Sequence, residues 1–343
     1  MSSPYSNSAV GSEGSSGPRL VGRAPAWSTL VMRLVVALGG NALLRRGEAP
    51  TIERQRAHVV EAATRLAAVV PANEVVVTHG NGPQVGLLAL EAAAYHDVPD
   101  YPLDVLGAES QGMVGYLVEQ ELRRRLPAEV PVVTVLTTVE VDADDPAFAV
   151  PSKPIGPGYP EPEARRLEHE RGWVFAEDGS SWRRVVASPA PRRLVEEAPV
   201  RWLLERGSVV ICAGGGGVPV VADASGRPVG VEAVVDKDHA SSLLARDLGA
   251  DLLVLATDVP AVCSGYGTAE ERAVVAAHPE ALLASLGAEL PAGSMGPKVE
   301  AASVFASATG DPAVIGALSD IEALVAGTAG TRISVDVAGV RFG

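Results

Sequence analysis

The sequence predicts an α/β protein built on a mainly parallel sheet, with a small subdomain inserted into it. Short apolar runs alternate with longer stretches of helical periodicity along most of the 343 residues, as in parallel strands linked by crossover helices. Apolar residues make up 47% of the chain and aromatic residues only 4%, so the core must rest on Val, Ala and Leu. Such a core favours strands that are covered by helices on both faces.

The first part of the alternation predicts three strands and three helices. The apolar runs that are short enough for buried strands are 34–38, 74–78 and 132–137. The stretches with helical periodicity are 51–70, which Pro71 ends, about 84–95 and about 108–125.

The alternation breaks between about 142 and 187. Six prolines fall between Pro146 and Pro162, and they exclude a long helix at the start of this stretch. A hairpin is expected after them, with strands at 172–176 and 182–186. We interpret this region as a subdomain that rises off the sheet.

Strands and helices resume after the insertion. Strands are predicted at 209–213, 252–257 and 312–315, and helices at about 238–248 and 298–309. The strand at 312–315 is expected to close the sheet.

Composition also limits the location of the protein. Residues 1–31 are rich in Ser, Gly and Pro without periodicity, which predicts a disordered tail rather than a signal peptide. No apolar run reaches the length of a membrane span. Cys212 and Cys263 lack metal-ligand spacing and are expected in the core of a protein in a reduced compartment. We expect a soluble, cytoplasmic protein.

The formal net charge of −14 argues against nucleic acid or an anionic membrane as a partner. Individual lysines, rather than the field of the whole protein, must then meet any anionic substrate. The chain contains neither a GxxxxGK[ST] loop nor a GxGxxG fingerprint. Phosphate chemistry would therefore need another scaffold.

Three glycine clusters follow predicted strands: Gly39-Gly40, Gly80-Asn81-Gly82 and Gly214 to Gly217. The carboxyl ends of parallel strands form the edge where ligands bind, and glycine lets backbone N–H groups approach an anion closely. Tight turns are the simpler explanation of any one cluster. Three clusters at one edge, two of them with an embedded Asn, favour a ligand site.

A lysine lies between two carboxylates in Val235-Asp236-Lys237-Asp238-His239, at the start of a predicted helix. We expect Lys237 to neutralise charge on a transferring phosphoryl group while Asp238 holds one or more lysines in position. Asp238 equally suits a plain helix N-cap.

Two further lysines lie in turns rich in glycine and proline. Lys298 follows Gly296-Pro297 at a helix start, where it suits either a polyphosphate contact or a capped surface helix. Lys153 stands in a proline-rich loop of the inserted subdomain.

The 6 histidines offer no recognisable base, and His79 is expected to lie behind a ligand without contacting it. Lysines, aspartates and backbone amides suit a nucleophile that is already anionic.

In combination these motifs resemble those of the carbamate kinases, in the amino acid kinase superfamily. The similarity runs from about Leu34 to Ile333. The segments that carry it are 37–43, 78–86, 102–104, 110–113, 153–157, 183–186 with 188–189, 214–221, 235–238, 257–259 and 295–300.

The resemblance implies an open αβα sandwich with a small protruding subdomain, assembled as a homodimer. The N-terminal half, 32–207, would bind carbamate and carry a lid at about 142–187. The C-terminal half, 208–343, would bind ATP or ADP with Mg²⁺. The implied activity is that of an ATP:carbamate phosphotransferase, which transfers a phosphoryl group reversibly between ATP and carbamate and generates ATP from carbamoyl phosphate.

The resemblance also implies a role for each site residue. Lys237 and Lys298 would clamp the phosphates, Asp238 would organise them, and Lys153 would reach the acceptor from the lid. The residues around carbamate and the transferring group would be Gly39, Gly40, Asn41, Gly80, Asn81 and Gly82. The residues at the nucleotide would be Gly214, Gly215, Asp236, Asp258, Val259, Tyr266, Met295 and Gly296. No side chain is assigned to a protein-bound metal.

Two other functions stay open at this point. A related kinase would phosphorylate another small carboxylate, phosphonate or phosphate, because the acceptor site contains little beyond glycine and Asn to select a substrate. A non-catalytic nucleotide sensor would belong to a different class. The presence of Lys153, Lys237 and Lys298 argues against a sensor.

Overall fold

The computed structural model describes residues 31–40, 43–44, 48–49, 51–95, 97, 99–287, 289–290 and 295–343. These residues belong to one compact unit, Val31–Gly343. Apart from Val31, the tail predicted at 1–31 lies outside the described residues, and so does Asn41.

A ten-stranded sheet forms the centre of this unit, in the order β13-β14-β16-β15-β12-β1-β2-β9-β3, with β17 paired to β14. The pairings from β3 across to β15 are all parallel. The strands are β1 (Met32–Leu38), β2 (Asn73–His79), β3 (Val132–Thr134), β9 (Val209–Ile211), β12 (Leu252–Thr257), β13 (Cys263–Ser264), β14 (Arg272–Ala277), β15 (Ala313–Ala317), β16 (Thr331–Ile333) and β17 (Val340–Phe342).

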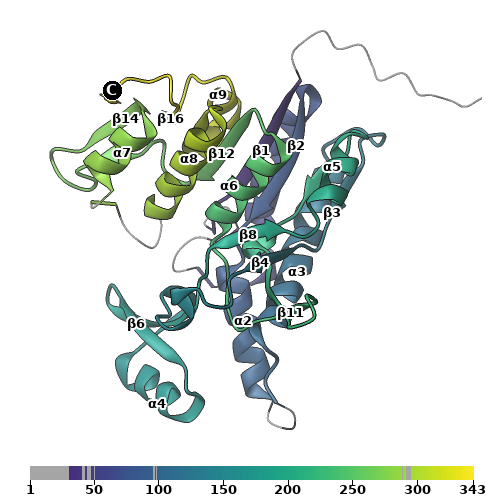
Figure 1. Ribbon diagram of the computed structural model, residues 1–343, viewed down its shortest axis with the longest axis vertical. Coiled ribbons are helices and arrows are strands. Elements are labelled where there is room, and N and C mark those ends of the chain that lie inside the picture. Colours follow the sequence, from purple (N-terminus) through teal and green to yellow (C-terminus); the bar gives the residue numbers. More distant parts are fainter. Residues whose placement is uncertain are drawn as a thin grey trace, which may run out of the picture. The chain divides into compact units, whose positions relative to one another are not determined.

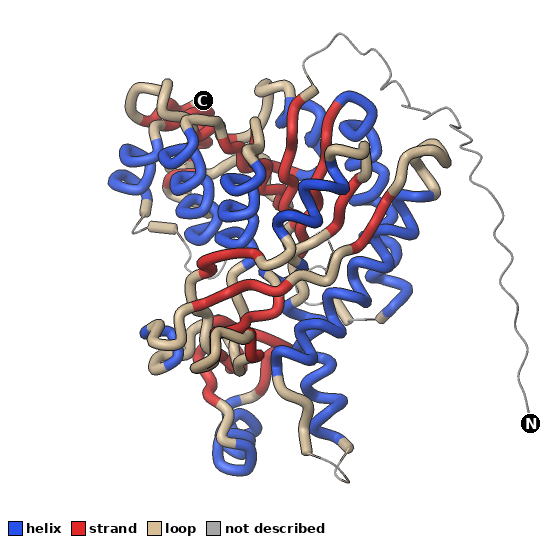
Figure 2. The backbone as a smooth tube through the Cα atoms, turned by 45° about the vertical axis from the view of Figure 1, so that its right-hand side comes forward, coloured by secondary structure: helices blue, strands red, loops and turns tan. Residues whose placement is uncertain are grey.

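Helices cover both faces of this sheet (Figure 2). Leu34, Val36 and Leu38 of β1 pack in one buried cluster with residues of α1 (Ile52–Val69), α3 (Leu103–Arg123) and α9 (Ile321–Val325). Val35 and Ala37 point to the opposite face, where the helices are α5 (Glu197–Leu204), α6 (Lys237–Leu248), α7 (Pro279–Leu286) and α8 (Met295–Thr309). Successive residues of a strand alternate between faces, so one apolar strand serves two cores. The predicted αβα sandwich is confirmed.

Two smaller sheets accompany the main one. The first contains β4 (Thr138–Val141), β8 (Pro191–Leu194), β10 (Val218–Ala222) and β11 (Pro228–Gly230), in the order β11-β10-β4-β8. The second contains β5 (Lys153–Tyr159), β6 (Val174–Asp178) and β7 (Ser181–Val186), in the order β5-β7-β6, and carries α4 (Glu161–Arg171). We call this second sheet with α4 the lid. Figure 1 shows α4 and β6 projecting away from the main sheet.

The lid matches the predicted inserted subdomain and its hairpin, since β6 and β7 pair with Asp178 opposite Ser181. The expectation that Lys153 lies in a loop is wrong, because Lys153 begins β5. The prolines of this strand are tolerated because β5 is an edge strand with an irregularity between Ile155 and Gly158.

Several predicted boundaries are also wrong. The helix expected at 108–125 begins at Leu103, whose N–H donates to Glu232 Oε1 at 3.0 Å. The strand expected at 132–137 ends at Thr134, and the chain then enters a different sheet. The strand expected at 312–315 does not close the sheet, because β16 pairs with its far side and β14 lies beyond β16.

The cysteines differ from each other in burial. Cys212 is fully buried, as expected, and burial raises the pKa of its thiol to about 12. Cys263 is only partly buried, and both thiols are free. Within the described residues, no helix combines the length and the apolar character that a bilayer crossing would require.

The lid is fixed at its base against α2 (Gly82–Ala94). A Cβ atom on Gly86 would lie 2.0 Å from Gly156 Cα, so the backbones of α2 and β5 touch directly. Ile155 and Val186 of the lid share a buried cluster with Val85 and Ala89 of α2. The backbone position of Lys153 is therefore set by packing at the base of the lid.

The Gly86–Gly156 contact predicts that Gly86→Ala is destabilising. The added methyl must push two backbones apart, which should lower the free energy of unfolding by about 1–3 kcal/mol. Gly107→Ala, in α3 with no atom near its Cβ position, is the control and should raise it by about 0.5–1 kcal/mol. Urea unfolding measures both. Equal stability of the two variants would contradict the close contact.

Candidate active site

The first two glycine clusters meet at the carboxyl edge of the main sheet. Leu38 is in register with His79 of β2 and with Ala256 of β12. Gly39 N–H donates to the Ala256 carbonyl at 3.0 Å, and Gly80 N–H to the Leu38 carbonyl at 3.3 Å. A Cβ on Gly80 would lie 3.5 Å from Gly40 Cα. The ends of β1 and β2 thus form one surface of bare backbone.

The third cluster packs against the second. Gly214–Gly216 form a short 3₁₀ turn after β9. Gly215 has φ 63°, and a Cβ there would lie 2.2 Å from the Asn81 side-chain amide. Only glycine combines this left-handed conformation with so close an approach. The structure therefore brings all three predicted clusters together, as far as they are described.

Asp236 caps the helix that carries the lysine. Its Oδ1 accepts hydrogen bonds from Asp238 N–H at 2.8 Å and His239 N–H at 3.3 Å, and α6 begins at Lys237. The alternative in which Asp238 is the N-cap is wrong, because the helix starts one residue earlier than predicted. The Asp238 side chain is thereby free for the lysines.

Asp238 holds two ammonium groups. Lys237 Nζ donates to Asp238 Oδ1 at 2.5 Å, and Lys298 Nζ, from α8, donates to Asp238 Oδ2 at 3.1 Å. The exposed fractions of the three side chains are 10%, 10% and 6% for Lys237, Lys298 and Asp238. Charges this deeply buried are costly unless they are paired. Two cations share one anion here, which leaves a positive charge in excess.

The electrostatics of this trio keep Asp238 ionised. Burial alone would raise the pKa of Asp238, but the ammonium groups of Lys237 and Lys298 outweigh it and hold the pKa below its ordinary value. Burial is also the largest influence on Lys237 and lowers its pKa, with Asp238 opposing that shift. The carboxylate is thus the fixed charge on which the two lysines depend.

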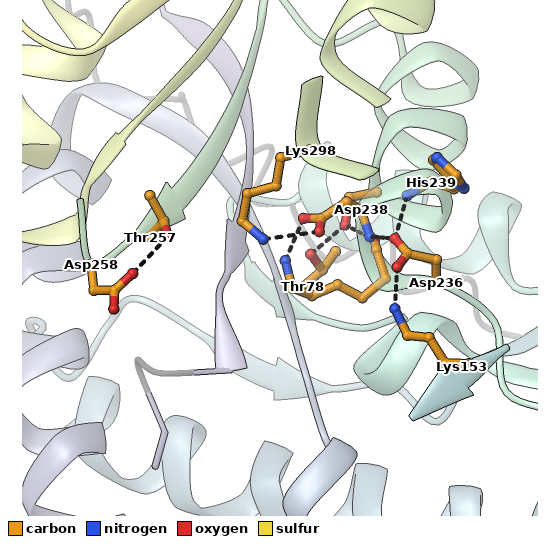
Figure 3. Close-up of polar contacts among 10 residues, drawn as sticks. Thr78, Lys153, Asp236, Asp238, His239, Thr257, Asp258 and Lys298 are labelled. Carbon is orange, nitrogen blue, oxygen red and sulfur yellow. Dashed lines mark hydrogen bonds and ion pairs between the residues drawn. The ribbon is translucent and has the colours of Figure 1, made fainter. Parts of the chain in front are cut away.

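The third lysine reaches the same helix from the lid. Lys153 Nζ donates to Asp236 Oδ2, so the three lysines are joined through two neighbouring acids. In Figure 3, Lys153 comes from a lid strand on one side of Asp236, and Lys298 approaches Asp238 from the other. Lys153 lowers the pKa of Asp236 far below its ordinary range, although burial by itself would raise it.

These three residues are the only lysines in the sequence. All other residues in its count of Lys and Arg are arginines. Lysine occurs at only three positions, and the fold brings all three to one place. This count was available from the sequence and would have singled out Lys153 without reference to any family.

The hydroxyl groups of Thr78 and Ser241, which the sequence did not single out, stabilise the backbone at Lys237. Ser241 Oγ donates to the Lys237 carbonyl at 2.6 Å, so Thr78 Oγ1 must be the donor in its own 2.6 Å contact with Ser241 Oγ. Both side chains are fully buried. The chain of bonds ties the first turn of α6 to the end of β2. The only sequence signal was the helical spacing of Ser241 from Lys237.

Side-chain amides stabilise the loops around the glycines. Asn81 is buried, and its Nδ2 donates to Ser110 Oγ at 2.7 Å. Gln111 forms a two-bond pair with the backbone of Thr137, at 3.0 and 3.1 Å. Thr137 Oγ1 in turn accepts from Ala213 N–H, just before the third glycine cluster.

His79 lies under the glycines and is neutral. Burial is the main reason why its pKa falls to about 4, with Lys237 adding to the fall and the bond to the Gly80 carbonyl opposing it. The ring is 1% exposed, and its Nδ1–H donates to that carbonyl at 2.9 Å. As expected from the sequence, it is not placed to contact a ligand directly.

The residues predicted at the nucleotide are more dispersed. Asp258 follows β12 at the same sheet edge, and Thr257 Oγ1 donates to Asp258 Oδ1 at 3.1 Å. Figure 3 shows this pair to one side of the lysines. Met295 and Gly296 open α8 shortly before Lys298, while Tyr266 is 66% exposed.

Comparison with known proteins gives the class first. The sequence profile of the amino acid kinase family matches residues 32–317, and the chain belongs to this family. Carbamate kinase of Haemophilus influenzae is 56% identical over 311 residues, which cover 91% of this chain and 99% of that protein. Carbamate kinase of Rhizobium meliloti is 56% identical over 305 residues, covering 88% and 93%.

A solved structure agrees with these relatives. Carbamate kinase from Giardia lamblia bound to AMP-PNP superposes with a TM-score of 0.81 at 40% identity, over 89% of this chain and 99% of that one. Within the family, the place of the chain is among the carbamate kinases, as its motifs predicted.

The buried neutral His79 predicts a pH dependence of stability. Its folded pKa, about 4, lies below the ordinary value, so the unfolded state gains a proton first as pH falls. Its contribution to stability is complete above pH of about 6.5 and is lost below it. From pH 7 to pH 5 the loss should be about 2 kcal/mol.

Urea unfolding of the wild type and of His79→Asn at both pH values measures this loss. Asn keeps a donor toward the Gly80 carbonyl but does not titrate, so the difference between the two proteins isolates the histidine. Parallel pH dependences would contradict a buried neutral ring.

Proposed function

We propose that this protein is a carbamate kinase that transfers a phosphoryl group reversibly between ATP and carbamate and generates ATP from ADP and carbamoyl phosphate. The observation that carries the proposal is the convergence of Lys237 and Lys298 on Asp238, next to the backbone of Gly40 and Gly80. The 56% identity to carbamate kinase of Haemophilus influenzae supports the choice of carbamate.

The lysine pair supplies charge where a transferring phosphoryl group would need it. Since Asp238 balances only one of two buried ammonium groups, the site favours an incoming anion. The cations are already oriented by Asp238, so they need no rearrangement during the reaction, and preorganised charge of this kind is the main source of catalysis in phosphoryl transfer. Lys153 would reach the acceptor from the lid.

Backbone amides of the glycine clusters would surround carbamate and the transferring group. Gly39, Gly40, Gly80 and Asn81 lie at the strand ends, and Gly82 is the first residue of α2. The N–H groups of Gly39 and Gly80 are bonded within the sheet, so the anion would be met by the backbone amides that follow them and by the dipole of the α2 N-terminus. Asn41 is assigned to the same role by resemblance alone.

The reaction needs no general base. Carbamate and the terminal phosphate of ADP both attack through oxygens that already carry negative charge, so positioning and charge neutralisation are sufficient. His79, the histidine nearest to the glycines in sequence, is neutral and buried at pH 7.

The nucleotide would bind in the C-terminal half, 208–343, with carbamate in the half 32–207. Gly214 and Gly215 would face the phosphates together with Met295 and Gly296. Asp258, Val259 and Tyr266 would lie near the nucleoside. The similarity to a relative solved with AMP-PNP supports a nucleotide as a ligand of this chain.

Mg²⁺ would arrive with the nucleotide. Among the described residues, no group of three His, Cys, Asp or Glu side chains is placed to hold a metal by itself. Mg²⁺ commonly binds through one or two carboxylates and the substrate phosphates, so the nucleotide would supply most of its ligands. The ion would neutralise phosphate charge. A homodimer and a cytoplasmic location stay predictions.

The proposal predicts ATP formation when the purified protein is given Mg·ADP and carbamoyl phosphate. Lys237→Met and Lys298→Met should each lower kcat by about 10²–10³-fold, because each removes preorganised positive charge. Arg246→Met removes a cation from the other end of α6 and should leave kcat unchanged. A luciferase-coupled assay measures all four proteins.

Two outcomes would decide against this activity. No ATP from carbamoyl phosphate would reject it. ATP from acetyl phosphate, but none from carbamoyl phosphate, would instead identify a related kinase that acts on another small carboxylate.

A further inference from the structure

Asp236 uses both of its carboxylate oxygens, and each holds a different part of the molecule. Oδ1 accepts the N–H groups of Asp238 and His239 at the start of α6. Oδ2 accepts the ammonium group of Lys153 from the lid. The side chain is 11% exposed, so solvent screens neither interaction strongly.

Lys153 needs such a partner more than the other lysines do. Its side chain is 30% exposed, against 10% for Lys237 and Lys298, so packing restrains it least. A lysine side chain loses much rotamer entropy when it is fixed. The backbone of Lys153 is paired with Val186 in the lid sheet, but that pairing does not fix the position of the ammonium group.

Electrostatics alone would drive Lys153 away from its observed position. A cation at the N-terminus of a helix meets the positive end of the helix dipole. Two further ammonium groups lie around Asp238, whose oxygens they already occupy. The carboxylate of Asp236 lies between the helix and Lys153, and its negative charge offsets both repulsions.

We propose that Asp236 is a positioning residue that docks the Lys153 ammonium group on the N-terminus of α6, so that the lid and the Lys237–Asp238–Lys298 clamp act as one unit. This proposal rests on the proposed function for the role of the clamp. It replaces the direct nucleotide contact that the resemblance implied for Asp236.

Asp236→Asn tests the proposal, because Asn caps a helix as well as Asp and removes only the charge that holds Lys153. We expect kcat for ATP formation to fall by about 10²-fold, the cost of a displaced catalytic group, with KM for Mg·ADP unchanged. In a Lys153→Met background the same substitution should have no further effect on kcat, because the two residues act as one unit.

Asp223→Asn is a closely matched control. Asp223 Oδ1 also accepts backbone N–H groups, from Ser225 and Arg227, while its Oδ2 pairs with the Arg227 side chain. It lies in the turn between β10 and β11, outside the site. Its variant should keep the wild-type kcat. If Asp236→Asn does not fold, Asp236→Ser keeps a good N-cap without a carboxylate and replaces it.

A second measurement does not depend on activity. Lysine labelled with ¹³C at Cε gives three resonances, because the chain contains only three lysines, and Lys153→Met assigns one of them. Asp236→Asn should shift the Lys153 resonance more than that of Lys298, and Asp223→Asn should shift neither.

The outcomes separate the possibilities. Wild-type kcat in Asp236→Asn, or an unmoved Lys153 resonance, would overturn the proposal. An equal loss of kcat with and without Lys153 would show that Asp236 acts independently of that lysine, and it would overturn the proposal. A rise in KM for Mg·ADP alone would indicate a contact with the nucleotide and would overturn it too. An inactive wild type in which the Lys153 resonance still shifts would reject the proposed function but keep the docking contact.

Discussion

The structure depends on the burial of one carboxylate between two ammonium groups. An unpaired charge at the position of Asp238 would cost several kcal/mol, so α6 and α8 must bring Lys237 and Lys298 to it together. The apolar core enforces this approach, since Leu244 of α6 and Phe305 of α8 are fully buried in the same cluster. Ser242 Oγ also donates to the Ala301 carbonyl across the two helices, at 2.9 Å. Core packing and the charge cluster therefore fix the same geometry.

The main sheet contributes exposed backbone, rather than side chains, to the site. Parallel register brings the ends of β1, β2 and β12 to one edge, and glycine at the first two ends leaves the backbone there without side chains to cover it. The third glycine turn closes on Asn81 rather than adding side chains of its own. Charge comes from the helices and hydrogen-bond donors from the strand ends, so neither element alone defines a phosphate site.

Sequence patterns predicted what local chemistry determines. Buried strands followed by glycine, and a lysine flanked by acids, were recognisable because the signal lies within a few residues. The sheet formed by β4, β8, β10 and β11 was not, because Thr138 pairs with Val218 across a long stretch of chain. The sequence predicted a helix from about 238, whereas α6 begins at Lys237. This difference of one residue determines the roles of Asp236 and Asp238. Which acid caps the helix, and which binds lysine, was therefore decided only by the fold.

Asp238 differs from another shared acid of the chain in how deeply its cations are buried. Each ammonium group uses a single oxygen, Oδ1 for Lys237 and Oδ2 for Lys298. Arginine can share an acid in the same way, since Glu121 Oε1 pairs with Arg124 and its Oε2 pairs with Arg125. Those two arginine side chains are 59% and 22% exposed, against 10% for each of the two lysines. The excess positive charge at Asp238 is therefore shielded from solvent, and it would attract an incoming anion more strongly than an exposed cation pair would.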